Sequence, residues 1–374
     1  MIKRIISLAA AAALCMPVRS YSSSALDDGW TEAELPRGWL LWHSYNSYAA
    51  LDSELYLRTP DGIVKTVSGD FVHAMNGSFG RSPGQFTFMA IDRTADEWDI
   101  YLSDRGEIID LTRNSGFRNE DPKFSPDGRT IVFKRGHWDN NADGFVYDLA
   151  LLDVKTREVT MLTDDSAEEA MPCFSADGKY IYYASYTDGI GSICRLDVST
   201  KTSETIFGEN GVNAYYPIVC GDMVYFTKWC SADNRCDQIM CCDGEKRTSL
   251  PFNSDKYDCS DACPVGGGKM VFSSTMSGGY DLYYYDGSHV SPLTELNSGR
   301  NELGADFFAF DLVIGDVNSD GEFTVADIVL FQKWLLASPD AKLGNWQNAD
   351  LCKDGRLDVF DLCLMKRELF GKWQ

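Results

Sequence analysis

The strongest constraint on the fold is a phrase that recurs along most of the chain. It reads DPKFSPDG at 121–128 and MPCFSADG at 171–178, and weaker copies start near 216 and 263. The prolines of the four copies, Pro122, Pro172, Pro217 and Pro264, lie 50, 45 and 47 residues apart. A period of this length indicates several adjacent copies of one supersecondary unit.

Each copy of the phrase opens a group of short strands. Runs of Tyr, Phe, Val and Ile are broken by Asp-Gly and Gly-Gly turns, and no long segment has a helical period, which predicts β-structure. After the phrase come a polar loop, a strand that ends in Asp, such as 149–153, and a last strand that closes near 162–163. Four strands in about 45 residues are typical of a propeller blade.

The two ends of this region complement each other. Residues 39–45, 55–58 and 63–67 supply three strands without a first one, whereas 301–308 repeats only the start of the phrase. We therefore expect 301–308 to complete the first blade and to close a six-bladed, mainly β propeller over residues 36–310. Closure removes the exposed sheet edges that invite aggregation.

The Phe-Ser-Pro-Asp-Gly phrase resembles the repeats of TolB-like propellers, which are also seen in some peptidases and oligogalacturonate lyases. The resemblance covers residues 36–310 and implies a fold without implying an activity. No domain with a Gly-x-Ser-x-Gly nucleophile elbow follows the propeller, so the peptidase variant of this family is set aside.

The last part of the chain carries two loops with the spacing of calcium ligands. Residues 316–327 read DVNSDGEFTVAD, with oxygen-bearing side chains at positions 1, 3, 5, 9 and 12 and glycine at position 6, as Ca²⁺ loops require. The pattern returns thirty-four residues later as DLCKDGRLDVFD. We expect two Ca²⁺ sites with these ligands, position 7 acting through its carbonyl: Asp316, Asn318, Asp320, Glu322, Thr324 and Asp327, then Asp350, Asp354, Arg356, Asp358 and Asp361.

The second loop departs from the pattern at one position. Cys352 stands at position 3, where an oxygen ligand is expected. A thiol is a soft ligand and binds Ca²⁺ poorly. We therefore expect the second site to be weaker than the first, or to use a water molecule at this position.

Each loop runs straight into an amphipathic segment, 328–336 or 362–370. This loop-then-helix unit, with Asp at position 12, resembles the type I dockerin family over residues 315–374. The resemblance implies a small all-α module that docks to the cohesin of a scaffoldin in a cellulosome-type complex. It assigns these residues to the cohesin face: Val325, Ala326, Gln332, Lys333, Val359, Phe360, Lys366 and Arg367. The alternative for Val359 and Phe360 is that they belong to the core.

The N-terminus has the order of a secretory signal: basic residues at 3–4, an apolar run over 5–16 and small residues near 20–25. The run of about 12 residues is too short to span a bilayer. We expect a cleaved signal over 1–25 and a secreted, extracellular protein without a membrane span. Without this segment the net charge moves from −22 to −25, which disfavours nucleic acid and anionic membranes as partners.

Of the twelve cysteines, Cys15 leaves with the signal and eleven remain. Six of these form two crowded groups: Cys230, Cys236, Cys241 and Cys242, and then Cys259 and Cys263. Local disulfides are expected if the compartment is oxidising, but the sequence leaves their pairing open. The chain lacks the paired C-x-x-C motifs of a zinc ribbon.

In a propeller blade, the loop between the second and third strands opens on the same face as the connection from the previous blade. In this chain these loops carry aromatic residues beside many Asp and Asn, a mixture that can stack on sugar rings and hydrogen-bond their hydroxyls. The expected ligand-face residues are Tyr48, Trp98, His137, Trp138, Tyr186, Trp229 and Tyr280. Turn formation and packing between blades are the alternative explanation.

Three functions remain open at this point. The propeller recognises plant cell-wall carbohydrate during polysaccharide catabolism, or it is itself a polysaccharide lyase or glycoside hydrolase, or it is a structural component that merely occupies a cohesin. No catalytic residue is assigned, because the acids are too numerous to select a pair and the four histidines are scattered.

Overall fold

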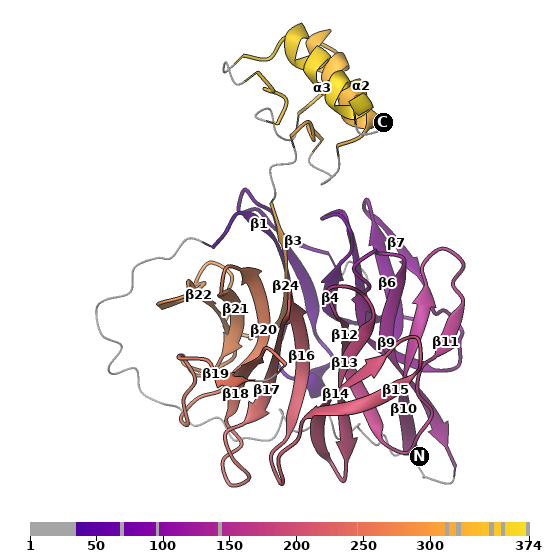
Figure 1. The fold of residues 1–374 in the computed structure, drawn as a ribbon, viewed down its shortest axis with the longest axis vertical. Helices are drawn as coiled ribbons and strands as arrows, with labels where there is room; N and C mark the ends of the chain where they lie inside the picture. The colour runs from indigo at the N-terminus through magenta and orange to yellow at the C-terminus, as the bar shows by residue number, and fades with distance from the viewer. Residues whose placement is uncertain are drawn as a thin grey trace.

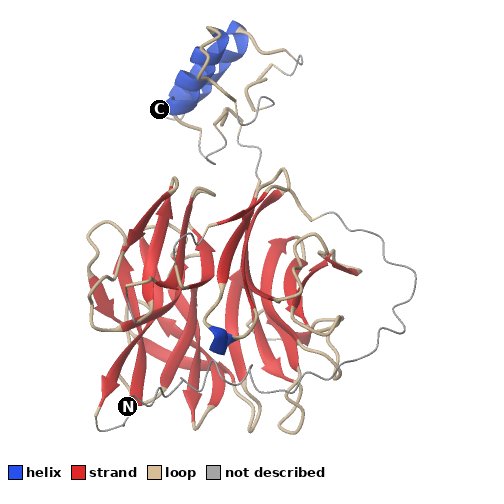
Figure 2. Ribbon diagram, turned by 180° about the vertical axis from the view of Figure 1, so that it is seen from behind, coloured by secondary structure: helices blue, strands red, loops and turns tan. Residues whose placement is uncertain are grey.

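The computed structural model describes residues 35–67, 71–94, 97–140, 144–244, 246–310, 314–318, 323–343, 348–352 and 356–371. The expected signal peptide, residues 1–25, lies outside them. The described chain forms a six-bladed β-propeller followed by a small module with two helices (Figures 1 and 2). The expected fold class is therefore confirmed.

The propeller consists of six four-stranded antiparallel sheets, and the strands of each blade are named from the innermost outward. Blade 1 consists of β24 (Asn301–Ala309), β1 (Gly38–Tyr45), β2 (Glu54–Arg58) and β3 (Val64–Thr66). Blade 2 consists of β4 (His73–Phe79), β5 (Gln85–Ile91), β6 (Asp99–Asp104) and β7 (Glu107–Asp110). Blade 3 consists of β8 (Arg118–Phe124), β9 (Thr130–Asp139), β10 (Gly144–Asp153) and β11 (Val159–Met161). Blade 4 consists of β12 (Glu168–Phe174), β13 (Tyr180–Thr187), β14 (Ile190–Asp197) and β15 (Thr202–Phe207). Blade 5 consists of β16 (Ala214–Cys220), β17 (Met223–Trp229), β18 (Asp237–Cys242) and β19 (Arg247–Ser249). Blade 6 consists of β20 (Cys259–Gly266), β21 (Lys269–Ser274), β22 (Asp281–Tyr285) and β23 (Val290–Pro292).

The first blade is shared between the two ends of the propeller, as expected. β24 pairs antiparallel with β1 in a register that runs from Gly38↔Ala309 to Tyr45↔Asn301. A short 3₁₀ helix, η1 (Tyr48–Ala50), follows β1. Because the ring closes through strand pairing, each innermost strand has a neighbouring blade on both sides.

The recurring phrase forms the turn between the first and second strands of a blade. In blade 3 the Ser125 hydroxyl donates to the Asp127 carboxylate at 2.7 Å, and in blade 4 Ser175 donates to Asp177 at the same distance. The following glycines have positive φ angles of 64° and 71°, which favour glycine. The two full copies of the phrase therefore recur because they supply the same turn chemistry.

Apolar clusters fill the space between neighbouring blades. Between blades 2 and 3, Ile100 of β6 packs with Ile131 and Phe133 of β9, and all three are 0% exposed. Burying such a side chain contributes about 1.5–3 kcal/mol. The alternating apolar residues of the sequence thus become the contacts that hold the ring together.

Every innermost strand contains a β-bulge, which the sequence did not predict. The register shifts by one residue in each strand. The shift coincides with residues whose φ lies between 53° and 62°: Asn76, Asp121, Met171, Tyr216, Asp261 and Gly304. A bulge bends its strand and re-aims the neighbouring side chains, so these six positions form an equivalent set around the propeller.

The bulges also show that the four prolines of the repeat do not all occupy equivalent positions. Pro122, Pro172 and Pro217 each follow the bulged residue directly, where a residue without an N–H is tolerated. Pro264 lies three residues after Asp261, and Ala262 takes the equivalent position in blade 6. The fourth proline of the repeat is therefore not equivalent to the other three.

The C-terminal module is built on α2 (Val325–Leu335) and α3 (Val359–Gly371). Thr324 caps α2 through a capping box with Asp327, which satisfies N–H groups at the start of the helix. The two helices share a core that includes Val317, Phe331 and Met365. The module therefore has its own core, which contains no propeller residue.

We expect Gly304→Ala to weaken the closed ring. Gly304 has a φ of 62°, and a Cβ there would lie 2.5 Å from Cε1 of His43, so the variant suffers both backbone strain and a clash. Gly62→Ala is the matched control, because Gly62 also has a positive φ but has no heavy atom within 4 Å of the added Cβ.

In chemical denaturation we expect Gly62→Ala to lose about 1–2 kcal/mol of unfolding free energy from strain alone. Gly304→Ala should lose about 1–3 kcal/mol more, since the clash adds an overpacking cost. Equal losses in the two variants would show that the close approach of β24 to His43 does not constrain the ring.

Candidate functional site

The first calcium-type loop is held together by its last residue. One carboxylate oxygen of Asp327 accepts hydrogen bonds from the N–H groups of Val317 (3.0 Å) and Asn318 (3.2 Å). The other accepts from the N–H of Thr324 at 2.8 Å. Asp327 is fully buried, so position 12 ties the start of the loop to the start of α2.

The second loop repeats this arrangement. Asp361, fully buried at its position 12, accepts from the N–H of Cys352 (3.2 Å) with one oxygen and from the N–H of Asp358 (3.1 Å) with the other. These residues are the counterparts of Asp327, Asn318 and Thr324, each thirty-four positions on. The duplication seen in the sequence is therefore also a duplication of hydrogen bonds.

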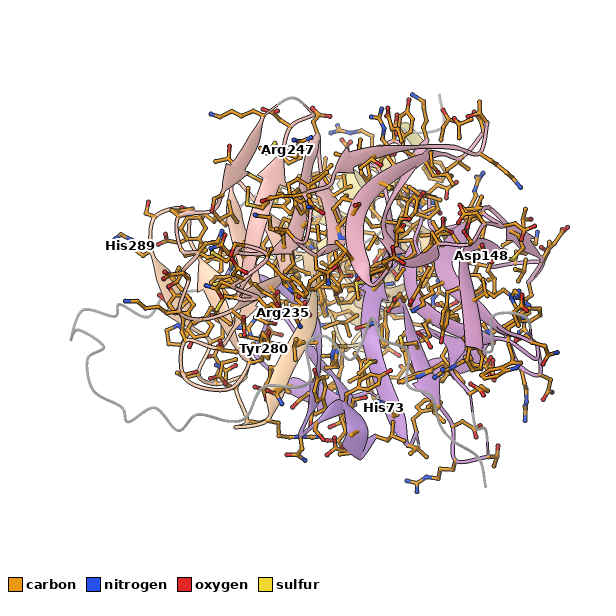
Figure 3. The ribbon with its side chains drawn as sticks, turned by 90° about the horizontal axis from the view of Figure 1, so that it is seen from below. His73, Asp148, Arg235, Arg247, Tyr280 and His289 are labelled. Carbon is orange, nitrogen blue, oxygen red and sulfur yellow. The ribbon has the colours of Figure 1, made fainter. Side chains whose placement is uncertain are left out.

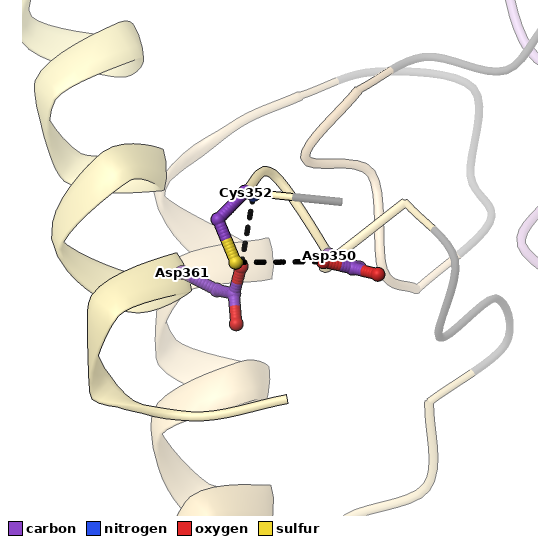
Figure 4. A group of neighbouring side chains, drawn as sticks. All are labelled: Asp350, Cys352 and Asp361. Atoms are coloured by element: carbon purple, nitrogen blue, oxygen red, sulfur yellow. Dashed lines mark hydrogen bonds between the residues drawn. The ribbon is translucent and has the colours of Figure 1, made fainter. Parts of the chain in front are cut away.

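Three side chains of the second loop converge on one point (Figure 4). One ligand atom each of Asp350, Cys352 and Asp361 lies within 4.8 Å of the other two. The Cys352 thiol is 3.7 Å from the Asp350 carboxylate. Two carboxylates at this spacing fit Ca²⁺, whereas the sulfur occupies a ligand position without supplying a hard donor.

The first loop fits Ca²⁺ better. Its described ligands Asp316, Asn318, Thr324 and Asp327 offer only oxygen donors, and Asp316 is 3% exposed. Three expected ligands, Asp320, Glu322 and Asp354, lie outside the described residues. Arg356, at position 7 of the second loop, is described, and its expected contribution is only its carbonyl.

The expected cohesin face is exposed. Val325 is 63%, Val359 is 58% and Phe360 is 71% exposed, so Val359 and Phe360 are not core residues. Ala326, Gln332, Lys333 and Arg367 are also exposed, and Lys366 is half-buried. Two further apolar residues at equivalent helix ends were missed from the sequence: Leu336, 77% exposed, and Phe370, 68% exposed.

The propeller has a second candidate site where the loops between second and third strands meet around the ring; we call this end the mouth face. Figure 3 looks at the propeller from below, with Tyr280 and Arg235 toward the middle of the view and His289 at its outer edge. β24 begins at this face and ends at the opposite one, so the chain leaves the propeller away from the mouth face (Figures 1 and 2).

One side of the mouth face carries a buried charged network. The Lys134 ammonium lies 2.9 Å from Glu168, 3.5 Å from Glu120 and 3.9 Å from the ring centre of Tyr147. Burial lowers the pKa of Lys134, but the neighbouring carboxylates together raise it by more, so the pKa of Lys134 lies above its usual value. Arg118, 3.0 Å from Glu97, extends the network.

The other side carries a buried carboxyl among tyrosines. Asp237 is 5% exposed, its Oδ2 accepts from the Tyr280 hydroxyl at 3.4 Å, and its N–H donates to Asp258 at 2.9 Å. Burial and then the charge of Asp258 raise the pKa of Asp237 well above its usual range, and a hydrogen bond from Tyr215 lowers it only in part. A carboxyl in such surroundings retains its proton to a higher pH than a solvated one.

Below the mouth, the channel between the innermost strands is narrow. Asn76 donates to Asp121 at 2.7 Å, Met171 N–H donates to Asp121 at 3.3 Å, and Gly304 N–H donates to Asp261. The cavity at this level measures about 10 Å³ and is lined by Asn76, Asp121, Lys123, Met171, Pro172, Tyr216 and Pro217. The space between the innermost strands is therefore too small for a polymer chain to pass through the channel.

The expected ligand-face residues fall into three groups. Trp98, Tyr186 and Trp229 are buried; Tyr48 and Tyr280 are half-buried; His137 and Trp138 are exposed on the β9–β10 hairpin. Trp98, 1% exposed, packs against His73 with ring centres 4.6 Å apart. Tyr48 interacts electrostatically with Lys134, Tyr280 with Asp237 and Tyr186 with both, so each of the three lies near one of the two charged groups of the mouth.

Sequence reasoning missed Lys134, Glu120 and Asp237. A signal for Lys134 was present, since it directly follows the apolar run 131–133, and a buried lysine requires acidic partners. Asp237 had no such signal, because its burial depends on Tyr280, which comes from the next blade.

The sequence profile of the family described as Dockerin type I domain matches residues 314–370. The C-terminal module is a type I dockerin domain. Such domains generally bind Ca²⁺, and their presence implies a cohesin partner. The resemblance inferred from the two loops is thus confirmed, and the calcium-type loops described above are those of a dockerin.

The propeller has structural neighbours of low sequence identity. TolB from Acinetobacter baumannii matches with a TM-score of 0.56 and 20% identity over 72% of this chain and 66% of that one. Hydrazine synthase from Kuenenia stuttgartiensis matches with a TM-score of 0.60 and 12% identity over 77% of this chain and 48% of that one. A puromycin hydrolase matches at 0.50 and 13% identity over 69% of this chain and 45% of that one. No curated protein matches the chain significantly.

These likenesses confirm a TolB-like propeller fold and nothing further about activity. The chain spans less than two thirds of the length of the three structures it matches. Among the residues that the structure describes, no helix is long and apolar enough to cross a membrane.

We expect the two calcium sites of the dockerin to differ because of Cys352. Asn318 and Cys352 occupy the same loop position, so reciprocal variants form a matched pair. Cys352→Asn should strengthen the second site about tenfold or more, since a hard oxygen replaces a soft sulfur, and Asn318→Cys should weaken the first to a similar extent, since it makes the reverse exchange.

Stepwise calcium titration by calorimetry, after removal of the metal with a chelator, measures both sites in the full chain. The unmodified protein should show two unequal affinities. Equal affinities in the unmodified protein, unchanged by Cys352→Asn, would contradict the assignment.

Proposed function

We propose that this protein is a secreted, extracellular component of a cellulosome-type complex. Its Ca²⁺-loaded dockerin binds the cohesin of a scaffoldin, and its propeller recognises plant cell-wall carbohydrate in polysaccharide catabolism. The proposal rests on the two calcium-type loops, which have matching hydrogen bonds. Each loop is followed by exposed apolar residues at the start of the next helix.

The docking part rests on how the two helices divide their residues. Ile328 and Phe331 of α2, with Leu362 and Met365 of α3, form the core, whereas Val325 and Val359, the first residues of the same helices, are exposed. Exposed apolar residues rimmed by polar ones mark interaction surfaces. Because Asp327 and Asp361 start the helices and close the loops, calcium binding orders the surface that contacts a cohesin.

The carbohydrate part rests on the chemistry of the mouth face. Half-buried Tyr48 and Tyr280 offer ring faces, and the charged groups around Lys134 and Asp237 offer hydrogen bonds to hydroxyls. Sugar ligands combine these two contacts. The net charge of −22 repels polyanions, so a neutral polysaccharide is the preferred ligand.

Catalysis at the mouth is a second candidate, favoured by Asp237. A buried carboxyl with a raised pKa beside other titratable groups is the usual form of a general acid. A polysaccharide lyase or glycoside hydrolase would use Asp237 in this role, with Asp258 or Tyr280 as its partner.

We expect the full chain to bind cohesins only in the presence of Ca²⁺. The double variant Ala326→Asp, Phe360→Asp places a charge on the apolar surface of both repeats and should weaken binding by about 100-fold or more, since buried unpaired charges are costly. Ile63→Asp, an exposed apolar position on the first blade (56% exposed), is the control.

Binding of the full chain and its variants is measured on surface-immobilised cohesins from several scaffoldins, once with calcium and once with a chelator. Binding that survives both the chelator and the double variant would refute the docking face. If no cohesin in a broad panel binds the calcium-loaded chain, the docking proposal as a whole fails.

We expect Tyr280→Ala to weaken polysaccharide binding by about 5–10-fold, because one aromatic contact contributes about 1 kcal/mol. His289→Ala is the control, since His289 is exposed on the turn between β22 and β23, at the opposite face. The assay measures retention on insoluble neutral polysaccharides. In the same samples it measures newly formed chain ends and unsaturated products.

Three outcomes separate the functions. Retention without products, reduced in Tyr280→Ala, supports a binding module. Products that disappear in Asp237→Asn identify an enzyme. Neither retention nor products would refute the carbohydrate proposal and leave a structural component carried by its dockerin.

A further inference from the structure

The structure joins none of the eleven cysteines of its described residues in a disulfide. Two of them stand directly opposite each other at the tip of the β17–β18 hairpin. The register of this hairpin ends at Trp229↔Asp237. One step toward the tip, the N–H of Cys230 donates to the carbonyl of Cys236 at 2.7 Å, which continues the same register.

This position has the geometry that a disulfide needs. Residues joined by a hydrogen bond across two antiparallel strands have Cα atoms about 5.5 Å apart and side chains on the same face of the sheet. Disulfides span Cα separations of about 4.4–6.8 Å, most often near 5.5–6 Å. The regular pairing of the two strands ends here, so the tip can adjust to the geometry of a disulfide.

No other pair of cysteines shares a cross-strand position in the described sheets. In the same hairpin, Cys241 faces Tyr225 and Cys242 faces Val224. Cys259 and Cys263 of β20 face Ser274 and Val271. The crowding seen in the sequence therefore reduces to one matched pair.

We propose that Cys230 and Cys236 form a reversible disulfide that closes the tip of this hairpin at the mouth of the propeller. The oxidant is a low-molecular-weight disulfide such as oxidised glutathione. One cysteine thiolate attacks a sulfur of the oxidant and releases one glutathione thiolate. The second cysteine thiolate then attacks the mixed disulfide and releases the other, so two thiols are oxidised while one external disulfide is reduced.

The surroundings assign the order of attack. Nε2 of Gln238 donates to the Cys230 sulfur at 3.3 Å, which stabilises a thiolate. The Cys236 thiol instead donates to the carbonyl of Asp255 at 3.5 Å, and burial together with Asp258 raises its pKa to about 11. Cys230 is therefore the first nucleophile, and Cys236 resolves the mixed disulfide.

The location gives the bond a consequence beyond local stability. The tip that it would close carries Arg235, whose guanidinium lies 4.6 Å from the ring centre of Trp229. The next residue after the pair is Asp237, which contacts Tyr280. Oxidation would fix the end of the hairpin beside the buried carboxyl, whatever ligand the propeller binds.

The full chain, reduced and then freed of reductant, is incubated with excess oxidised glutathione and digested with trypsin after alkylation. Trypsin cleaves after Lys228, Arg235 and Lys246, so the two cysteines fall in different peptides, 229–235 and 236–246. We expect these peptides to be joined and fragmentation to place the bond between Cys230 and Cys236.

Cys230→Ser and Cys236→Ser should each abolish the joined peptides. Cys241→Ser is the matched control, because it removes a neighbouring half-buried thiol from the same hairpin and should leave the bond intact. Circular dichroism checks that each variant is folded. A bond from Cys236 to Cys241, Cys242 or Cys259, or glutathione adducts that never resolve, would overturn the proposal.

Discussion

The pairing of β24 with β1 is the interaction on which the rest of the structure depends. It joins residues more than 250 positions apart in the chain, from Gly38↔Ala309 to Tyr45↔Asn301. Closing so long a loop costs entropy, and apolar packing at both blade contacts of the closing strand offsets that cost, for example Ala305 in one cluster with Val271 of blade 6, and Phe308 against Phe79 of blade 2. Without it, two blades would expose apolar faces and unpaired edges.

Once the ring is closed, its innermost strands hold polar groups close together. The positions of the bulges determine which of these groups meet. Asn76 and Asp121 meet across blades because both are bulged residues. The same logic explains the charges at the mouth, where Lys134 is buried between Glu120 and Glu168. Buried ion pairs of this kind add little net stability, so this network is not what holds the ring together.

The sequence predicted everything that depends on local repetition. The blade period, the closing segment and both loop-helix units follow from motifs that recur at a fixed spacing. It failed where the outcome depends on packing between blades: Pro264 resembles the other repeat prolines but lies three residues after the bulge at Asp261, and Trp98 sits in a loop pattern but is buried against His73. Asp237 could not be singled out, since its partner Tyr280 comes from another blade. Periodicity gives the strand, whereas burial of each side chain depends on neighbours that are distant in sequence.

The topology also limits how the two functional parts can influence each other. β24 runs from the mouth face, where the Glu302 N–H donates to the Tyr280 carbonyl at 2.8 Å, to the opposite face, from which the chain continues to the dockerin. It is therefore an element that both sites share. Coupling between two sites also requires that each ligand distinguishes two states of the protein, and the described residues show β24 in one arrangement only. Docking would therefore act by raising the local concentration of the propeller near its polymer, which adds avidity without changing the intrinsic affinity of the mouth.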